Sequence, residues 1–225
     1  MADGSGNGPP QPAVMRAVFA YAERAMGGKD ASHDWSHVQR VIGNARRIAS
    51  AEAEELAAAG RPLDCALVDV LAAIHDVRDH KYAPGAGAET EDAVIASLVA
   101  AGIPATTAAT AVALAPHVSF SRQYGPPTPP PPPPVVTAYA QELAIVRDAD
   151  RLDSMGAVGV ARTFAYGAAA GRSLSNGLVH FDEKLLRLVG CLTTKSGRAM
   201  GRERHALLVQ FASAMRDELA GGAGV

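Results

Sequence analysis

Apolar residues recur every three to four positions along most of the chain, and residues that favour helices fill the places between them. This period matches one face of an α-helix, whereas a half-buried strand would alternate apolar and polar residues. The pattern predicts helices over residues 13–26, 34–59, 64–74, 90–101, 105–115, 137–154, 157–170, 181–188 and 198–219. No useful stretch alternates as a strand would, and no repeat period is visible, so we expect an irregular all-α domain.

One of these predicted helices, residues 64–74, is apolar at nearly every position. A helix that is hydrophobic all round is typical of a buried element. Asp64 stands at its start. We therefore expect this helix to lie at the centre of the fold.

Two segments depart from the helical pattern. Residues 1–12 are rich in Gly and Pro and are expected to be a disordered tail, which leaves a single domain over residues 13–220. Residues 125–134 read GPPTPPPPPP and can form only a loop or a polyproline II rod, because each proline fixes φ and removes a backbone donor. Such a rod could dock a polyproline-binding partner, but we favour a tolerated insertion in a surface loop.

Composition narrows the class of protein further. A chain of 225 residues suits one buried core, and 21 Lys and Arg against 23 Asp and Glu leave a net charge of −2. That balance argues against duplex nucleic acid or an anionic membrane as a partner. Cys65 and Cys191 stand far apart in apolar runs, which predicts reduced core thiols. With no signal peptide or membrane-spanning run visible, we expect a cytoplasmic protein.

The histidines carry the strongest chemical signal. His33 and His37 in HDWSHVQRV are four residues apart and would share a helix face, while His75 and Asp76 in AAIHDVRDHKY end the apolar helix. Taken alone, a histidine at such a place is more often a capping or core residue. Adjacent residues on a helix diverge by about 100°, so other helices would have to complete any metal site.

A suitable source of carboxylates is the segment IVRDADRLDSMG. Asp150 and Asp153 are three residues apart and share a helix face, whereas Asp148 points elsewhere. Each acid alone could be a surface ion pair. Two imidazoles with two carboxylates would instead suit Mn²⁺, Fe²⁺, Zn²⁺ or Mg²⁺, with positions left for water and substrate. The conjunction of these motifs favours the metal site.

The order His37, His75-Asp76 and Asp150 resembles the HD-domain superfamily of metal-dependent phosphohydrolases, an all-α fold. More narrowly, HDWSHVQRV, HDVRDHKY, DADRLDSMGAVGVARTFAYG and HFDEKLLRL resemble its small YpgQ- and YedJ-like subgroup, over residues 32–205. The resemblance implies that His37, His75, Asp76 and Asp150 hold one divalent ion, with Mn²⁺ favoured. It also implies hydrolysis of nucleoside or deoxynucleoside triphosphates to the monophosphate and pyrophosphate.

Further residues near the motifs are candidates for catalysis or substrate binding. Asp79, three residues past Asp76, could be the general base, or it could pair with a neighbouring cation, and Asp76 could instead orient the proton. His33 could approach a phosphate, support His37, or cap the helix. A triphosphate needs several donors besides the metal. The candidate cations nearest the motifs are Arg40, Lys81, Arg162 and Lys184.

Several alternatives stay open at this point. Other HD-type nucleotide hydrolases, namely nucleotidases, triphosphohydrolases and cyclic nucleotide phosphodiesterases, use the same ligands, and a non-catalytic helical scaffold is a further alternative. His117 could belong to a second metal site, although we favour a single ion. Trp35 and Tyr166 could stack on a base, but packing is the commoner role for an aromatic residue on a helix.

Overall fold

The protein folds into helices alone over the residues that the computed structural model describes, which are 12–27, 35–78, 89–120 and 131–221. The all-α expectation is thus confirmed, while the single-domain assignment to residues 13–220 stays a prediction. The α-helices are α1 (Pro12–Ala25), α2 (Trp35–Ala58), α3 (Cys65–Ile74), α4 (Glu91–Ala100), α5 (Ala105–Leu114), α7 (Pro134–Ala138), α8 (Ala140–Asp153), α9 (Gly156–Ala169), α10 (Leu174–Glu183) and α11 (Lys195–Gly221). Two short 3₁₀ helices follow α5 and α10, namely η2 (Ala115–His117) and η3 (Leu185–Cys191).

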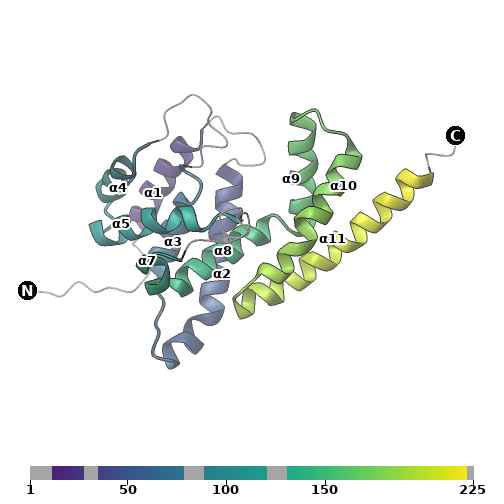
Figure 1. Cartoon of the computed structure of the whole chain (residues 1–225). Helices are drawn as coiled ribbons and strands as arrows, with labels where there is room; N and C mark the ends of the chain where they lie inside the picture. Colours follow the sequence, from purple (N-terminus) through teal and green to yellow (C-terminus); the bar gives the residue numbers. More distant parts are fainter. Residues whose placement is uncertain (1–11, 28–34, 79–88, 121–130, 222–225) are drawn as a thin grey trace, which may run out of the picture.

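The centre of the body is built from α2, α3 and α8, as Figure 1 shows. Every residue of α3 from Leu67 to Ile74 is buried, which confirms that this nearly all-apolar helix is central. Asp64 caps it, because its carboxylate accepts a hydrogen bond from the backbone N–H of Leu67 at 2.9 Å. The buried end of α3 delivers His75 and Asp76 to the interior, beside α2 and α8.

The last three helices form an arm that extends from the body (Figure 1). Gly156 begins α9 with φ of +68°, a backbone conformation that glycine adopts without strain, so the chain turns sharply after α8. Phe164 of α9, Phe181 of α10 and Phe211 of α11 meet with ring centroids 5.7–6.2 Å apart. This aromatic cluster joins the three helices into one packed unit.

Some predicted helix limits were wrong. The segment predicted as one helix over residues 137–154 is two, because Tyr139 leaves helical geometry between α7 and α8. The helix predicted at 181–188 begins earlier, at Leu174, where Ser173 caps it, and it continues as 3₁₀ turns. Pro134 belongs to α7 rather than to the proline-rich loop, since proline is tolerated in the first helical turn. Residues 125–130 of that loop lie outside the described residues.

The prediction that both cysteines are core residues was wrong. Cys65 and Cys191 are both free thiols, as expected, but each is only half-buried. Cys65 opens α3, and Cys191 closes η3, so both lie at helix ends rather than in the core. Among the described helices, none has the length and apolar content that a membrane span would need.

Candidate metal centre

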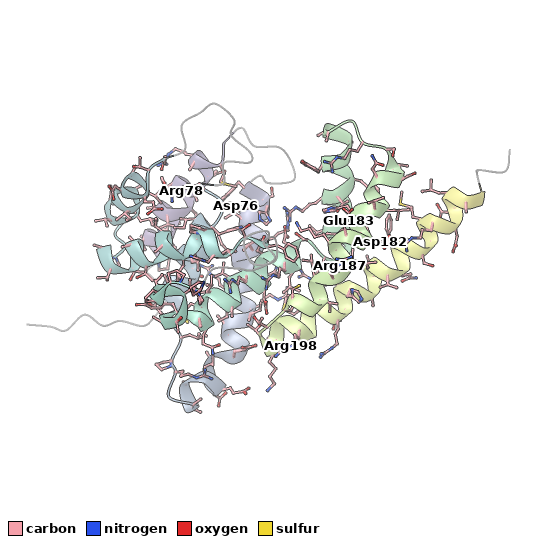
Figure 2. The ribbon with its side chains drawn as sticks, viewed as in Figure 1. Asp76, Arg78, Asp182, Glu183, Arg187 and Arg198 are labelled. Carbon is pink, nitrogen blue, oxygen red and sulfur yellow. The ribbon has the colours of Figure 1, made fainter. Side chains whose placement is uncertain are left out.

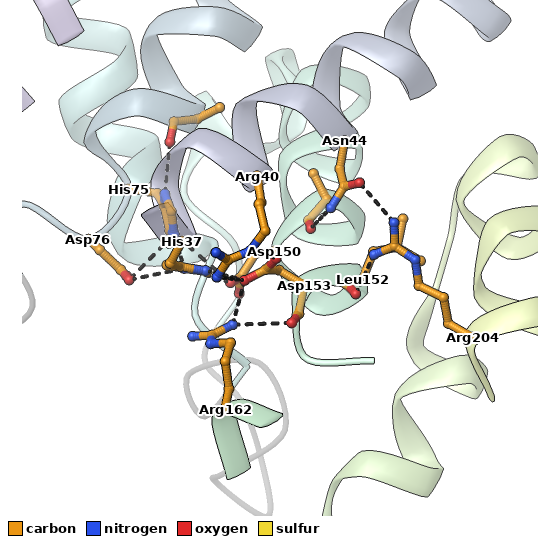
Figure 3. A network of polar contacts seen from close by, with 12 residues as sticks. His37, Arg40, Asn44, His75, Asp76, Asp150, Leu152, Asp153, Arg162 and Arg204 are labelled. Carbon is orange, nitrogen blue, oxygen red and sulfur yellow. Dashed lines mark hydrogen bonds and ion pairs between the residues drawn. The ribbon is translucent and has the colours of Figure 1, made fainter. Parts of the chain in front are cut away.

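Three helices bring together the four residues that the motifs singled out. His37 comes from α2, His75 ends α3, Asp76 follows it, and Asp150 lies on α8 (Figure 3). The Nε2 atoms of the two histidines are 3.3 Å apart. Oδ2 of Asp76 lies 3.5 Å from each of these nitrogens. Oδ1 of Asp150 lies 3.5 Å from Nε2 of His37 and 3.9 Å from Nε2 of His75. His37, His75 and Asp76 thus form a compact group with metal-ligand geometry, and the Asp150 carboxylate lies beside its two histidines.

The outer nitrogen of each imidazole is already engaged. Nδ1 of His75 donates to the backbone carbonyl of Ala72 at 2.9 Å, and Nδ1 of His37 donates to Oδ2 of Asp153 at 2.7 Å. Because both partners only accept, each ring donates from Nδ1, and the Nε2 atoms left for a metal ion face each other. Two lone pairs and two carboxylates at this distance repel unless a cation lies among them. The donor set therefore fits a divalent ion.

The surroundings of His37 favour positive charge. Its side chain is buried, and burial by itself would lower its pKa, but hydrogen bonds with Asp153 and Asp76 and the charge of Asp150 raise the pKa to about 9. Without a metal, the His37 ring would therefore be protonated on both nitrogens and positively charged at neutral pH. A metal ion and this proton would compete for the same Nε2 atom.

Asp153 connects the histidine to two arginines. The carboxylate is 2% exposed and accepts from Arg40 Nε at 2.7 Å and from Arg162 Nη1 at 2.7 Å, besides His37 (Figure 3). Burial would raise the pKa of Asp153, but the hydrogen bonds from His37 and Arg40 and the charge of Arg162 hold it well below its usual range. Such a buried anion fixes the orientation of the imidazole that it contacts.

The other predicted site residues divide into two groups. Arg40 and Arg162 both contact Asp153, so they lie directly behind His37. Lys184 stands at the C-terminal end of α10, with its ammonium 5.6 Å from the ring centroid of Phe120. The remaining predicted residues fall outside the described residues, and these are His33, Asp79 and Lys81.

Sequence reasoning missed the role of Asp153. The spacing placed it on the same helix face as Asp150, and the structure shows what that face does: Asp150 lies near Nε2 of His37 while Asp153 holds Nδ1 of the same ring. Asp148 points away from the cluster, as expected. It is fully buried and accepts hydrogen bonds from the backbone N–H groups of Thr193 and Thr194, which ties α8 to the start of α11.

Three other residues from the sequence analysis are placed as follows. Among the described residues, the group with metal-ligand geometry comprises His37, His75 and Asp76, and His117 is not part of it. Trp35 begins α2 and packs its ring at 6.0 Å from that of Phe19. Tyr166 is 39% exposed on α9, where the guanidinium of Arg172 lies 5.3 Å from its ring centroid.

Comparison with known proteins gives one relative by sequence. The chain is 30% identical over 208 residues to the uncharacterized protein YpgQ of Bacillus subtilis, covering 91% of this chain and 93% of YpgQ. No protein-family model matches the chain.

Solved structures agree with this relationship. The crystal structure of Bacillus subtilis YpgQ in complex with ADP is 26% identical with a TM-score of 0.71, and the match covers 91% of this chain and 94% of that one. The crystal structure of a Lactobacillus plantarum protein is 26% identical in sequence with a TM-score of 0.72, and the match covers 94% of this chain and 99% of that one. The crystal structure of an HD-superfamily hydrolase from Bacillus thuringiensis is 25% identical with a TM-score of 0.65, and the match covers 92% of this chain and 96% of that one. With its helical fold and its His-Asp cluster, this chain belongs to the YpgQ-like family of HD-superfamily hydrolases.

Proposed function

We propose that this hydrolase converts nucleoside or deoxynucleoside triphosphates to the monophosphate and pyrophosphate with the help of one divalent metal ion. The observation that carries the proposal is the pair of Nε2 atoms 3.3 Å apart, with carboxylates of Asp76 and Asp150 beside them. The motif resemblance supports the triphosphate substrate, and the ADP complex of the relative YpgQ supports a nucleotide ligand.

In this proposal His37, His75, Asp76 and Asp150 hold the ion. The resemblance favours Mn²⁺, and the mixed nitrogen and oxygen donors also suit Mg²⁺, Fe²⁺ or Zn²⁺. When bound, the ion lowers the pKa of a coordinated water and polarises a phosphoryl oxygen. The side chain of Asp76 is 17% exposed, so its carboxylate reaches solvent at the edge of the cluster and can orient the attacking water. Asp79 remains a proposed general base.

The cations behind and beside the cluster complete the proposed site. Arg40 and Arg162 are held by Asp153 close to the metal ligands, and Lys184 stands at the C-terminal end of α10. We assign these three residues, together with His33 and Lys81, to binding the phosphate groups of the substrate. Several such donors are needed because a triphosphate carries about three to four negative charges, more than one divalent ion neutralises.

Product analysis tests the proposal directly. Purified protein is stripped of metal, reloaded with Mn²⁺ or Mg²⁺, and incubated with ATP, GTP, deoxynucleotides, monophosphates and cyclic nucleotides. We expect metal-dependent pyrophosphate from triphosphates, and its loss in His75→Ala and Asp76→Ala. Asp69→Asn is the matched control, because this carboxylate is also buried and paired, with Arg46, but lies away from the cluster.

The other outcomes separate the alternatives. Orthophosphate from monophosphates would make the protein a nucleotidase, triphosphate as product would make it a triphosphohydrolase, and opened cyclic nucleotides would make it a phosphodiesterase. Absence of turnover with metal bound would contradict an enzymatic role. In that case, capture of a polyproline-binding domain by residues 125–134 would support the scaffold instead.

A further inference from the structure

The arm contains a second feature that the metal cluster does not use. A cleft of about 320 Å³ lies between α9 and α10. Its polar lining includes four basic residues together with Tyr166 and Asn176, and no carboxylate lines it among the described residues. The basic residues are Arg162, Arg172, His180 and Lys184. A recess lined by several basic side chains favours an anionic ligand.

The walls of this cleft are rigid. Gly177 of α10 packs directly on Phe164 of α9, so closely that a Cβ at position 177 would lie 2.5 Å from a ring carbon. Phe164 is itself fixed in the aromatic cluster with Phe181 and Phe211. The basic side chains on the facing helices are therefore held around a preformed space, which reduces the entropic cost of binding.

The charges in the cleft act on one another. The pKa of His180 is lowered, first by burial and then by the positive charges of Lys184 and Arg172, with Glu183 acting in the opposite direction. Figure 2 shows Glu183 and Asp182 on the arm, and neither of them lines the cleft. Part of the lowered pKa of His180 therefore comes from the cations beside it, in addition to its burial.

One side chain, that of Arg162, links the cleft to the candidate metal centre. Arg162 lines the cleft, and its Nη1 atom also contacts Oδ2 of Asp153 at 2.7 Å. The same oxygen accepts the hydrogen bond from Nδ1 of His37. A ligand that contacts the cations of the cleft would therefore reach toward the metal ligands from the arm side.

We propose that this cleft binds the phosphate groups that leave as pyrophosphate, with Arg172, Lys184 and Arg162 as the donors. This inference rests on the proposed function. In that reaction a water oxygen loses a proton and bonds to the α-phosphorus, the bond between the α-phosphorus and the bridging oxygen breaks, and its electron pair leaves with that oxygen on pyrophosphate. Cations beyond the scissile bond would stabilise the charge that develops there.

The structure favours phosphates over the base as the occupant. The ring of Tyr166, the exposed aromatic residue in the lining, is already covered by the guanidinium of Arg172 at 5.3 Å. A base would have to displace this arginine in order to stack. Phosphate oxygens could instead accept hydrogen bonds from the same guanidinium where it stands.

Binding of inorganic pyrophosphate to the metal-free protein tests the inference without catalysis. By titration calorimetry in EDTA, we expect Arg172→Gln and Lys184→Gln each to weaken binding roughly tenfold, the effect of one charge-assisted hydrogen bond. Arg187→Gln is the matched control, because Arg187 is exposed on η3 outside the cleft, and its affinity should be unchanged. Pyrophosphate should also raise the pKa of His180 in a histidine NMR titration, whereas adenosine should not.

The outcomes separate this inference from the proposed function. Equal pyrophosphate affinity in wild type, Arg172→Gln and Lys184→Gln would overturn the inference, even if triphosphates are hydrolysed. Adenosine that shifts His180 while pyrophosphate does not would overturn it in favour of a nucleoside site. If pyrophosphate binding depends on both residues but no triphosphate is cleaved, the proposed function and the assignment to departing phosphates both fail, and an oligophosphate-binding site remains.

Discussion

The Asp153→Asn variant tests whether Asp153 positions the metal ligand His37, apart from its contribution to the stability of the fold. The wild-type carboxylate accepts hydrogen bonds from three side chains, those of His37, Arg40 and Arg162. An asparagine of the same size has one accepting oxygen, and its NH₂ group would face one of these donors. The substitution therefore removes the negative charge at position 153. It also leaves at least one N–H donor of the surrounding side chains facing the NH₂ group of the asparagine, with no acceptor between them.

The structure sets the size of both effects. Asp153 is 2% exposed, whereas the side chain of Arg40 is 35% exposed and can regain water. Breaking a buried pair from one side costs about 3–5 kcal/mol, and the exposure of Arg40 places this case at the low end, about 3 kcal/mol. For a domain of this size that lowers Tm by roughly 6–12 °C. Loss of the carboxylate that orients a ligating histidine weakens metal affinity by about 10–100-fold.

The assay is Mn²⁺ titration by calorimetry beside thermal unfolding with and without Mn²⁺. Asp69→Asn is the control, because Asp69 is 4% exposed and accepts two hydrogen bonds of 2.8 Å from Arg46, away from the cluster. It should lose stability and keep its Mn²⁺ affinity. If Asp153→Asn is destabilised but binds Mn²⁺ as tightly as wild type, then Asp153 does not position His37 and the reasoning is refuted.

Three further predictions follow from the site and the arm. Since Asp153 and Asp76 raise the pKa of His37 to about 9, Mn²⁺ must displace a proton, so its affinity should rise about tenfold per pH unit from about pH 6.5 to 8.5. Calorimetry in buffers of different ionisation enthalpy should show this proton release, and a pH-independent affinity would contradict it. Asp150→Ala should weaken Mn²⁺ binding with little change in Tm, because its side chain is 23% exposed; unchanged Mn²⁺ affinity would remove Asp150 from the ligands. Gly177→Ala should lower stability by about 1–3 kcal/mol in thermal unfolding, because the new Cβ would overlap Phe164, and an unchanged Tm would show that the ring can move.

Sequence alone determined the fold class and the position of the central helix. A period of three to four residues distinguishes helix from strand through side-chain geometry, which is a local property. The composition of residues 64–74 placed them in the interior for a similar reason, because a helix without a polar side has no face to turn to water. The motif order also identified His37, His75, Asp76 and Asp150, which the fold brings together.

Tertiary structure alone decided how these residues are supported. Helical spacing showed that Asp150 and Asp153 share a face, but only the packing of α8 on α2 puts them at opposite nitrogens of one imidazole. Arg40 and Arg162 were expected at the substrate, and the fold places both on Asp153. The cleft between α9 and α10 likewise had no local signal. Periodicity tells which face of a helix is buried, whereas the partner across that face depends on how distant segments pack.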